Sequence, residues 1–162
     1  MRFGTRTDLG RRWAAAGVKP IGNQHIGYDY GYLSVAFNPV TGEVKMLILP
    51  NMTKESFQVF LDEFADGLKG ATILITDGTT AHRSQSLKPD EKISLELLPA
   101  YSPQLNPVER FFREVRRRLK NRVFTTYEEV ERAIIEITKP FIKASQAIKK
   151  LTCYNWLLNT PS

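Results

Sequence analysis

The sequence of 162 residues has very little cysteine and histidine and no long apolar run. Its single cysteine, Cys153, excludes an internal disulfide, and no cluster of Cys and His has the spacing of a zinc site. No apolar stretch approaches the roughly 18 residues that a membrane-spanning helix needs. The start, Met1 to Arg6, lacks the apolar core of a signal peptide. These absences predict a cytoplasmic protein without a membrane partner.

A basic surplus is present, and it is concentrated in one segment. Lys and Arg together number 23 against 17 Asp and Glu, which gives a net charge of +6. The segment 105–122 alone holds seven positive and two negative residues, a surplus of five charges. A local surplus of this size indicates a polyanionic partner such as nucleic acid.

The hydrophobic pattern predicts an α/β fold, a mixed sheet with flanking helices, in a chain long enough for one domain. Strands are expected at 28–37, 44–49, 71–76 and 93–98. Helices are expected from the N-cap Thr53 to Gly70, from the N-cap Asn106 to about residue 119, and from Thr126 to about Thr138. Pro140 should break the third helix, and a shorter helical end should follow. Residues 1–27 should be irregular, with Trp13 and the neighbouring alanines as their buriable side chains.

Two carboxylates stand where α/β folds place catalytic groups. Asp77 directly follows the expected 71–76 strand, although Asp77-Gly78 would equally form a simple turn. Glu109 follows Asn106 by three residues, so it could equally close a capping box at the helix start. Each acid alone is weak evidence, but two acids that share a metal ion can attack a phosphodiester.

A basic ridge follows Glu109 on the same helix. At about 100° per residue, Arg113, Arg116 and Lys120 share the face of Glu109, apart from the apolar stripe. With Arg117, these residues are candidates for contact with DNA phosphates. The alternative is a solvated face with pairs such as Glu114–Arg118, which would not explain the surplus. His82 could contact a phosphate or water near Asp77, or be an ordinary surface histidine.

The run LPAYSPQLNPVE, residues 98–109, resembles a signature of DDE transposases in the bacterial insertion-sequence branch of the mariner superfamily. Asp77–His82 resembles the second catalytic block of that family, and segments 12–20, 38–43 and 57–61 match as well. The resemblance implies an RNase H-like fold. It also implies that the partner is DNA, both the transposon ends and the target, and that the protein is associated with the nucleoid. It implies Asp77 and Glu109 as the second and third catalytic acids and as ligands of two Mg²⁺ or Mn²⁺ ions.

The same resemblance predicts an incomplete site. The family's first catalytic Asp lies on the first strand, just upstream of a segment similar to Arg2-Phe3-Gly4, so that acid and most of that strand should be missing here. The nearest acid, Asp8, lies in a loop-like stretch and is not a substitute. The family's N-terminal helix-turn-helix region is also not found, which predicts a single catalytic domain over residues 1–162.

Three functions remain open at this point. The chain is either a transposase catalytic domain with weak or no DNA cleavage and strand transfer alone, or a non-catalytic nucleic-acid-binding remnant or subunit. A free-standing RNase H-like hydrolase is a third, weaker option. A gap in the sheet should be filled by residues near Met1–Thr5, by a second copy of the chain or by rearrangement, and the unpaired edges predict a homo-oligomer.

Overall fold

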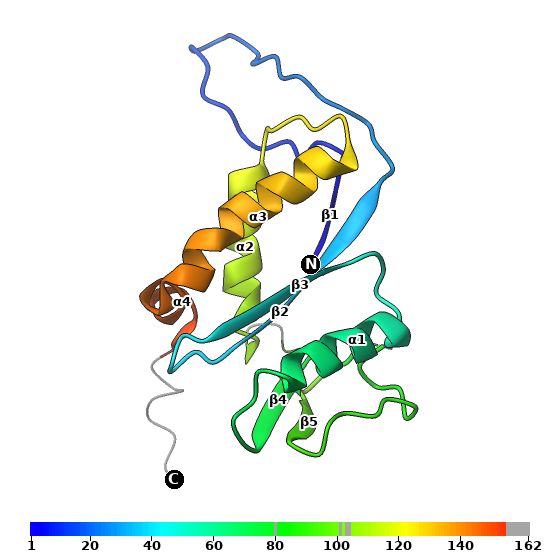
Figure 1. The fold of residues 1–162 in the computed structure, drawn as a ribbon. Coiled ribbons are helices and arrows are strands. Elements are labelled where there is room, and N and C mark those ends of the chain that lie inside the picture. Colours follow the sequence, from blue (N-terminus) through cyan, green and yellow to red (C-terminus); the bar gives the residue numbers. More distant parts are fainter. Residues whose placement is uncertain (80, 101, 103–104, 155–162) are drawn as a thin grey trace.

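A computed structural model describes residues 1–79, 81–100, 102 and 105–154. The described elements are, in chain order, β1 (Arg2–Gly4), β2 (Tyr30–Phe37), β3 (Val44–Leu49), α1 (Lys54–Ala65), β4 (Thr72–Thr76), β5 (Ile93–Leu97), α2 (Val108–Leu119), α3 (Tyr127–Lys143) and α4 (Ser145–Thr152) (Figure 1). The expected α/β class, with strands of both directions and flanking helices, is confirmed.

The strands form two sheets. β1, β2 and β3 make an antiparallel sheet, with Arg2 opposite Tyr32 and Tyr32 opposite Leu49. β4 and β5 make a parallel pair. The short strand Arg2–Gly4 thus occupies the place of the first strand beside β2 but does not reach β4. Within the described ranges, β4 pairs with β5 alone, so its other edge is open.

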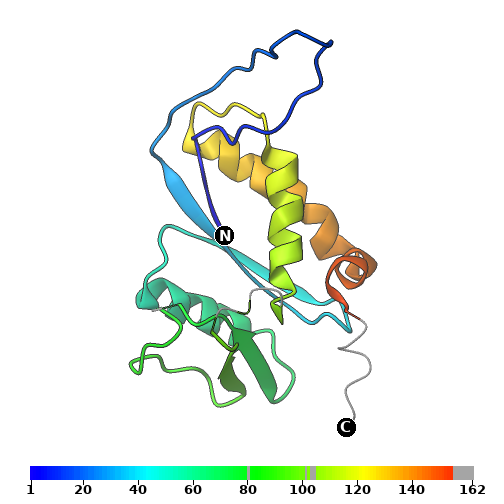
Figure 2. The ribbon, with the colours of Figure 1, turned by 180° about the vertical axis from the view of Figure 1, so that it is seen from behind.

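The hairpin of β2 and β3 is covered on both faces, because alternate side chains point to opposite sides of a strand. Leu33 and its neighbours on one face pack with α2, α3 and α4. Ala36 and Leu49 on the other face pack with α1, β4 and β5. Figures 1 and 2 show α2 and α3 on one side of the hairpin and α1 with β4 and β5 on the other. Two hydrophobic clusters therefore pack against opposite faces of the same sheet.

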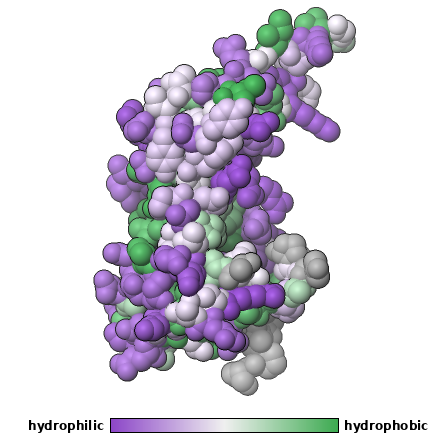
Figure 3. All heavy atoms as spheres, turned by 90° about the vertical axis from the view of Figure 1, so that its right-hand side faces the viewer, coloured by the Kyte–Doolittle hydropathy of each residue, from purple (hydrophilic) through white to green (hydrophobic). Residues whose placement is uncertain are grey.

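The segment between β1 and β2 projects away from both clusters. It is tied at its base by the amide of Thr5, which donates to the Asp29 carbonyl at 3.1 Å, and that of Thr7, which donates to His25 at 3.0 Å. Beyond these bonds Trp13 is fully exposed, so the expected burial of Trp13 is wrong. Residues 11–24 of the segment are all exposed, whereas Thr5 and Thr7 at its base are buried. Figure 3 shows hydrophobic side chains at its tip.

Two helix ends differ from the expectation. α1 ends at Ala65 rather than at Gly70, because Asp66 already closes the last turn with bonds to Asp62 and Phe64. Pro140 lies inside α3 rather than breaking the helix. Proline removes one backbone donor, but the following turn buries Phe141 against Phe111, with ring centroids 5.2 Å apart in an edge-to-face contact. Of the described helices, none is both long and apolar enough to cross a membrane.

Candidate active site

Asp77 is the first residue after β4 and is oriented by the loop that follows. Its Oδ1 lies 2.7 Å from Nδ1 of His82 and accepts from the amide of Thr79 at 3.3 Å. The hydrogen bond from His82 lowers the pKa of Asp77 most, and partial burial opposes this shift. Asp77 is therefore an ionised, half-exposed carboxylate at a strand end.

His82 is held from two sides. Its side chain is only 10% exposed, and its ring lies 4.1 Å from that of Phe57 on α1, centroid to centroid. Nδ1 also lies 3.1 Å from the main-chain oxygen of Asp77. His82, a candidate for DNA contact by its sequence, is thus placed behind Asp77 rather than on an open surface.

Glu109 stands in the first turn of α2 with its carboxylate free of the helix start. The expected capping box is not formed there: α2 begins at Val108, its N-cap is Pro107, and no side chain caps it. The side-chain oxygen of Asn106 accepts a hydrogen bond from the amide of Val108 at 3.2 Å. The reciprocal capping box occurs at α3, between Thr126 and Glu129. Glu109 is therefore available to face the cleft.

Asp77 and Glu109 line the same open cleft, which has a volume of about 450 Å³. The loop after β4 supplies one wall, and the other wall consists of Leu98, Pro99, Ala100, Ser102, Asn106 and Glu109. Arg83 lines this cleft as well, with its guanidinium against the backbone of Gly78. The structure thus brings together two acids that are 32 positions apart in the sequence.

The donor set of the cleft suits a hard divalent cation. Both acids present oxygen ligands, and Mg²⁺ is usually held by one or two carboxylates with waters completing its octahedron. In the part of the chain that the structure describes, no group of three His, Cys, Asp or Glu side chains gathers as a metal site. The residues present fit a partial magnesium site with two protein carboxylates.

The ridge residues of α2 have different surroundings. Nη1 of Arg116 lies 3.9 Å from Oε2 of Glu109, and its side chain is half-exposed. Arg117 is paired with Glu114, with both its bonds at 2.8 Å. Arg113 is exposed, and Lys120 lies against Gly10. The alternative interpretation of this face is thus borne out for Glu114, which also binds Arg118 at 2.9 Å.

The Met1 amine lies close to the same cleft. It donates to the Leu33 carbonyl at 2.6 Å. Its pKa is lowered to about 6, mainly by burial and also by the charge of Arg116, while the charges of Glu109 and Asp77 oppose the shift. The charges of both carboxylates thus act on the start of β1.

Sequence reasoning missed the arginines that the fold gathers from outside α2. Arg83 adjoins His82 in the sequence, which is the signal that could have found it. Arg2, Arg6 and Arg122 line a second pocket with Arg116. Arg122 lies in the basic segment 105–122, just after α2 ends. Arg2 and Arg6 gave no signal in the sequence, because only the pairing of β1 with β2 brings them to α2.

Comparison with solved structures identifies the class of fold. The chain is similar to Mos1 transposase in a paired-end complex with the left transposon end, with a TM-score of 0.61, 15% identity, and coverage of 95% of this chain and 54% of that one. The Mos1 strand transfer complex gives a TM-score of 0.58, 17% identity, and coverage of 92% and 52%. The chain spans about half the length of these transposases and shares their RNase H-like fold.

The sequence comparison names the family. The model of the DDE superfamily endonucleases matches residues 1–131, and the chain belongs to this family. An uncharacterized protein of Sinorhizobium fredii, y4pE/y4sA, is 33% identical over 104 residues, which cover 62% of this chain and 77% of that protein. The expected membership among DDE enzymes is thus confirmed.

Proposed function

We propose that this chain is the catalytic domain of a transposase that cuts and joins DNA with divalent metal ions. The observation that carries the proposal is the meeting of Asp77 and Glu109 in one cleft of an RNase H-like fold. Family membership and the likeness to Mos1 transposase support it. DNA, as transposon ends and target within the nucleoid, is the proposed partner.

The residues of the cleft have complementary roles in this proposal. Asp77 and Glu109 hold Mg²⁺ or Mn²⁺, and in the complete site two ions. Bound there, such ions would supply the activation of an attacking water or 3′-hydroxyl and the stabilisation of the departing oxygen. His82 orients Asp77, and Arg83 supplies a positive charge at the rim of the cleft for the DNA phosphate.

The basic face of α2 guides the DNA strand to this cleft. Arg113 and Arg116 lie on the face of Glu109, and Arg117 and Lys120 extend the charge along the helix. Phosphate contacts of this kind position a strand without reading its sequence. In a complex with DNA, Arg117 would give up part of its ion pair with Glu114 and contact a phosphate instead.

Cleavage by this chain alone should be slow or absent. Two carboxylates occupy the cleft where the two-metal chemistry of the family calls for three acidic ligands, and the described residues add no third to them. The loss of one ligand lowers metal affinity and leaves the second ion poorly held. Metal binding is therefore a sharper test than cleavage.

The test measures Mn²⁺ binding by electron paramagnetic resonance, with nicking of supercoiled plasmid recorded in the same samples. We expect Asp77→Asn and Glu109→Gln each to weaken Mn²⁺ binding at least tenfold, since each removes one of the two anionic ligands. Any nicking by the unaltered chain should disappear in each of the two variants. Glu136→Gln, an exposed acid on α3, is the matched control and should bind as the unaltered chain does. Equal Mn²⁺ affinity in all four proteins would overturn the proposal.

A non-catalytic nucleic-acid-binding subunit is the second candidate. The charge surplus of α2 favours it, because that feature needs no metal. In this case DNA binding would be unchanged in EDTA and would fall steeply with salt, while Asp77→Asn would leave every measured property intact.

A further inference from the structure

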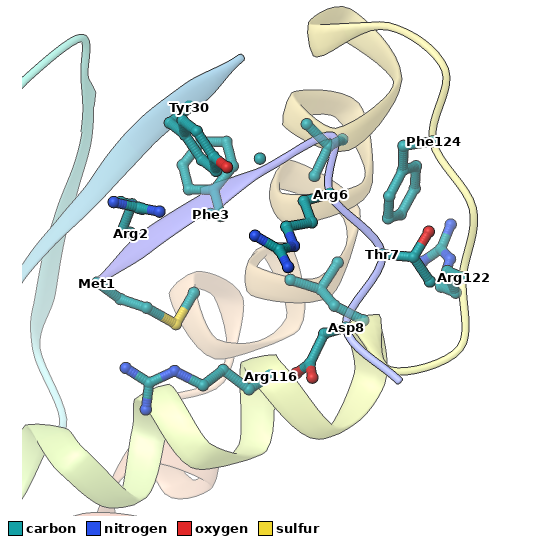
Figure 4. A pocket seen from close by; sticks show the side chains of 13 residues that line it. Met1, Arg2, Phe3, Arg6, Thr7, Asp8, Tyr30, Arg116, Arg122 and Phe124 are labelled. Atoms are coloured by element: carbon teal, nitrogen blue, oxygen red, sulfur yellow. The ribbon is translucent and has the colours of Figure 1, made fainter. Parts of the chain in front are cut away.

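A second pocket, of about 320 Å³, lies between β1, the residues after it and the C-terminal half of α2 (Figure 4). Its charged lining side chains are Arg2, Arg6, Asp8, Arg116 and Arg122. Four positive charges against one negative charge make it a site of strongly positive potential. Such a concave site concentrates anions.

The arginines of this pocket are poorly neutralised. Among the described residues, Arg2, Arg6 and Arg122 form no ion pair with a carboxylate. Arg2 instead lies over the ring of Tyr30 at 4.1 Å, and Arg122 lies over that of Phe124 at 5.0 Å. Stacking on a ring fixes a guanidinium and leaves its N–H edge available to an anion.

The floor of the pocket is apolar. It consists of Phe3, Leu119, Phe124 and Val130, and three of these are almost fully buried. A fitting ligand therefore combines an anionic group with a flat, weakly polar body. A nucleotide has both parts, and the pocket volume is at the lower end of the range of small-ligand sites.

The position of the pocket favours a nucleic acid over an acidic peptide. Arg116 lines the pocket and lies 3.9 Å from Glu109, so the pocket adjoins the carboxylate cleft along α2. The seven positions from Glu109 to Arg116 span roughly 10 Å of helix at about 1.5 Å per residue. That length corresponds to roughly three nucleotides at about 3.4 Å each.

We propose that this pocket binds one backbone phosphate and the adjoining nucleoside of a DNA strand, roughly three nucleotides from the phosphate held at Asp77 and Glu109. The course of the strand rests on the proposed function, but phosphate binding in the pocket needs no metal. Arg6 and Arg122 hold the phosphate, and Tyr30 or Phe124 borders the nucleoside. The pocket thus fixes the register of the strand at the cleft.

The test is fluorescence anisotropy of a short single-stranded oligonucleotide in EDTA, over a range of salt concentrations. The double substitution Arg6→Gln/Arg122→Gln should weaken binding about tenfold or more. It should also reduce the slope of log K against log salt, by roughly 0.7 for each lost phosphate contact. Arg132→Gln, an exposed arginine on α3 outside the pocket, is the control and should show neither effect.

A second measurement locates the phosphate. Oligonucleotides with one methylphosphonate linkage, placed at successive positions, remove one charge at a time. One position should weaken binding to the unaltered chain and have no further effect on the double variant. A flat profile, or a loss in the double variant no greater than in Arg132→Gln, would overturn the proposal.

Competition separates the pocket from its alternatives. An oligonucleotide should displace the labelled strand far better than inorganic phosphate or an oligoglutamate peptide of equal charge. Equal competition by the peptide would show a general anion site and would contradict a nucleotide pocket. These results can be told apart from those for the cleft. If the pocket does not bind DNA, Mn²⁺ binding should still depend on Asp77 and Glu109. If the proposed function is wrong, Mn²⁺ binding should be the same with and without these two carboxylates.

Discussion

His82 illustrates how one side chain can serve the cleft without lying in it. Its ring packs on Phe57 and its Nδ1 reaches the carboxylate of Asp77, so it couples the second hydrophobic cluster to the acid that we propose as a metal ligand. Residues of this kind fix the orientation of a ligand and raise metal affinity. We therefore consider His82 a positioning residue.

Replacement of His82 should weaken metal binding while the fold remains. His82→Ala removes the donor to Asp77, and we expect Mn²⁺ affinity to fall about tenfold, in the range seen for such partners. His82→Asn places an amide donor near the former Nδ1 and should restore much of the affinity. Isothermal titration with Mn²⁺ measures both.

His25 offers the matched control because it is the other of the two histidines in the sequence. It lies in the projecting segment, and its amide rather than its ring bonds to Thr7. His25→Ala should leave Mn²⁺ affinity unchanged. Equal affinity of the unaltered chain and His82→Ala would show that Asp77 needs no partner.

At the scale of the element, α2 combines a core stripe with a charged face. Phe111, Phe112 and Val115 are buried on one side. On the other side Glu114 bonds to Arg117 and Arg118, which holds two of the seven basic residues in place. The carboxylate is bound by two guanidinium groups, and the bonds from Arg117 contribute most to lowering the pKa of Glu114, to about 2.

Glu114 should stabilise the fold in a pH-dependent way. Because its pKa is lower in the folded chain than the ordinary 4.5, its contribution is present above pH 4.5 and is lost as pH falls toward 2. Solvent screening limits the contribution to about 0.5–1 kcal/mol. Glu114→Gln should lower the free energy of unfolding by that amount at pH 7, and the gap should narrow below about pH 4. Urea unfolding at both pH values checks this, with Glu136→Gln as the control. A gap that widens on acidification would contradict the sign.

The sequence predicted those elements that depend on local signals. The strand that ends before Asp77 and the helix that carries Glu109 both follow from short patterns of apolar residues and turn residues. β1 was expected only as one of three ways to fill the sheet, and otherwise residues 1–27 were expected to be irregular, because three residues form a strand only through their pairing with β2. The course of α3 through Pro140 likewise depends on the distant contact of Phe141 with Phe111. Long-range packing, which no local pattern contains, also brings Arg2 and Arg6 to the pocket beside Arg116 and Arg122.

At the scale of the whole molecule, β4 has one edge that pairs with no other strand of the described ranges. Leu74 packs into the second cluster, while Ile73 and Ile75 on the opposite face are 66% and 60% exposed. An unpaired edge beside exposed isoleucines is a template for pairing with another chain. We propose that two copies associate through β4.

Light scattering over a dilution series tests this association. The unaltered chain should dissociate from dimer to monomer on dilution, and Ile75→Lys should be monomeric throughout, because a lysine on each partner puts like charges in the contact. Ile142→Lys, an equally exposed position on α3, should dimerise normally. A monomer at every concentration with an intact sheet would contradict the proposal. Dimerisation that persists in Ile75→Lys would place the contact elsewhere, with the projecting segment and its exposed Trp13 as the next surface to alter.

Because the β4 edge borders Asp77, association there should also change Mn²⁺ affinity with protein concentration, a dependence that contact through the projecting segment would not produce.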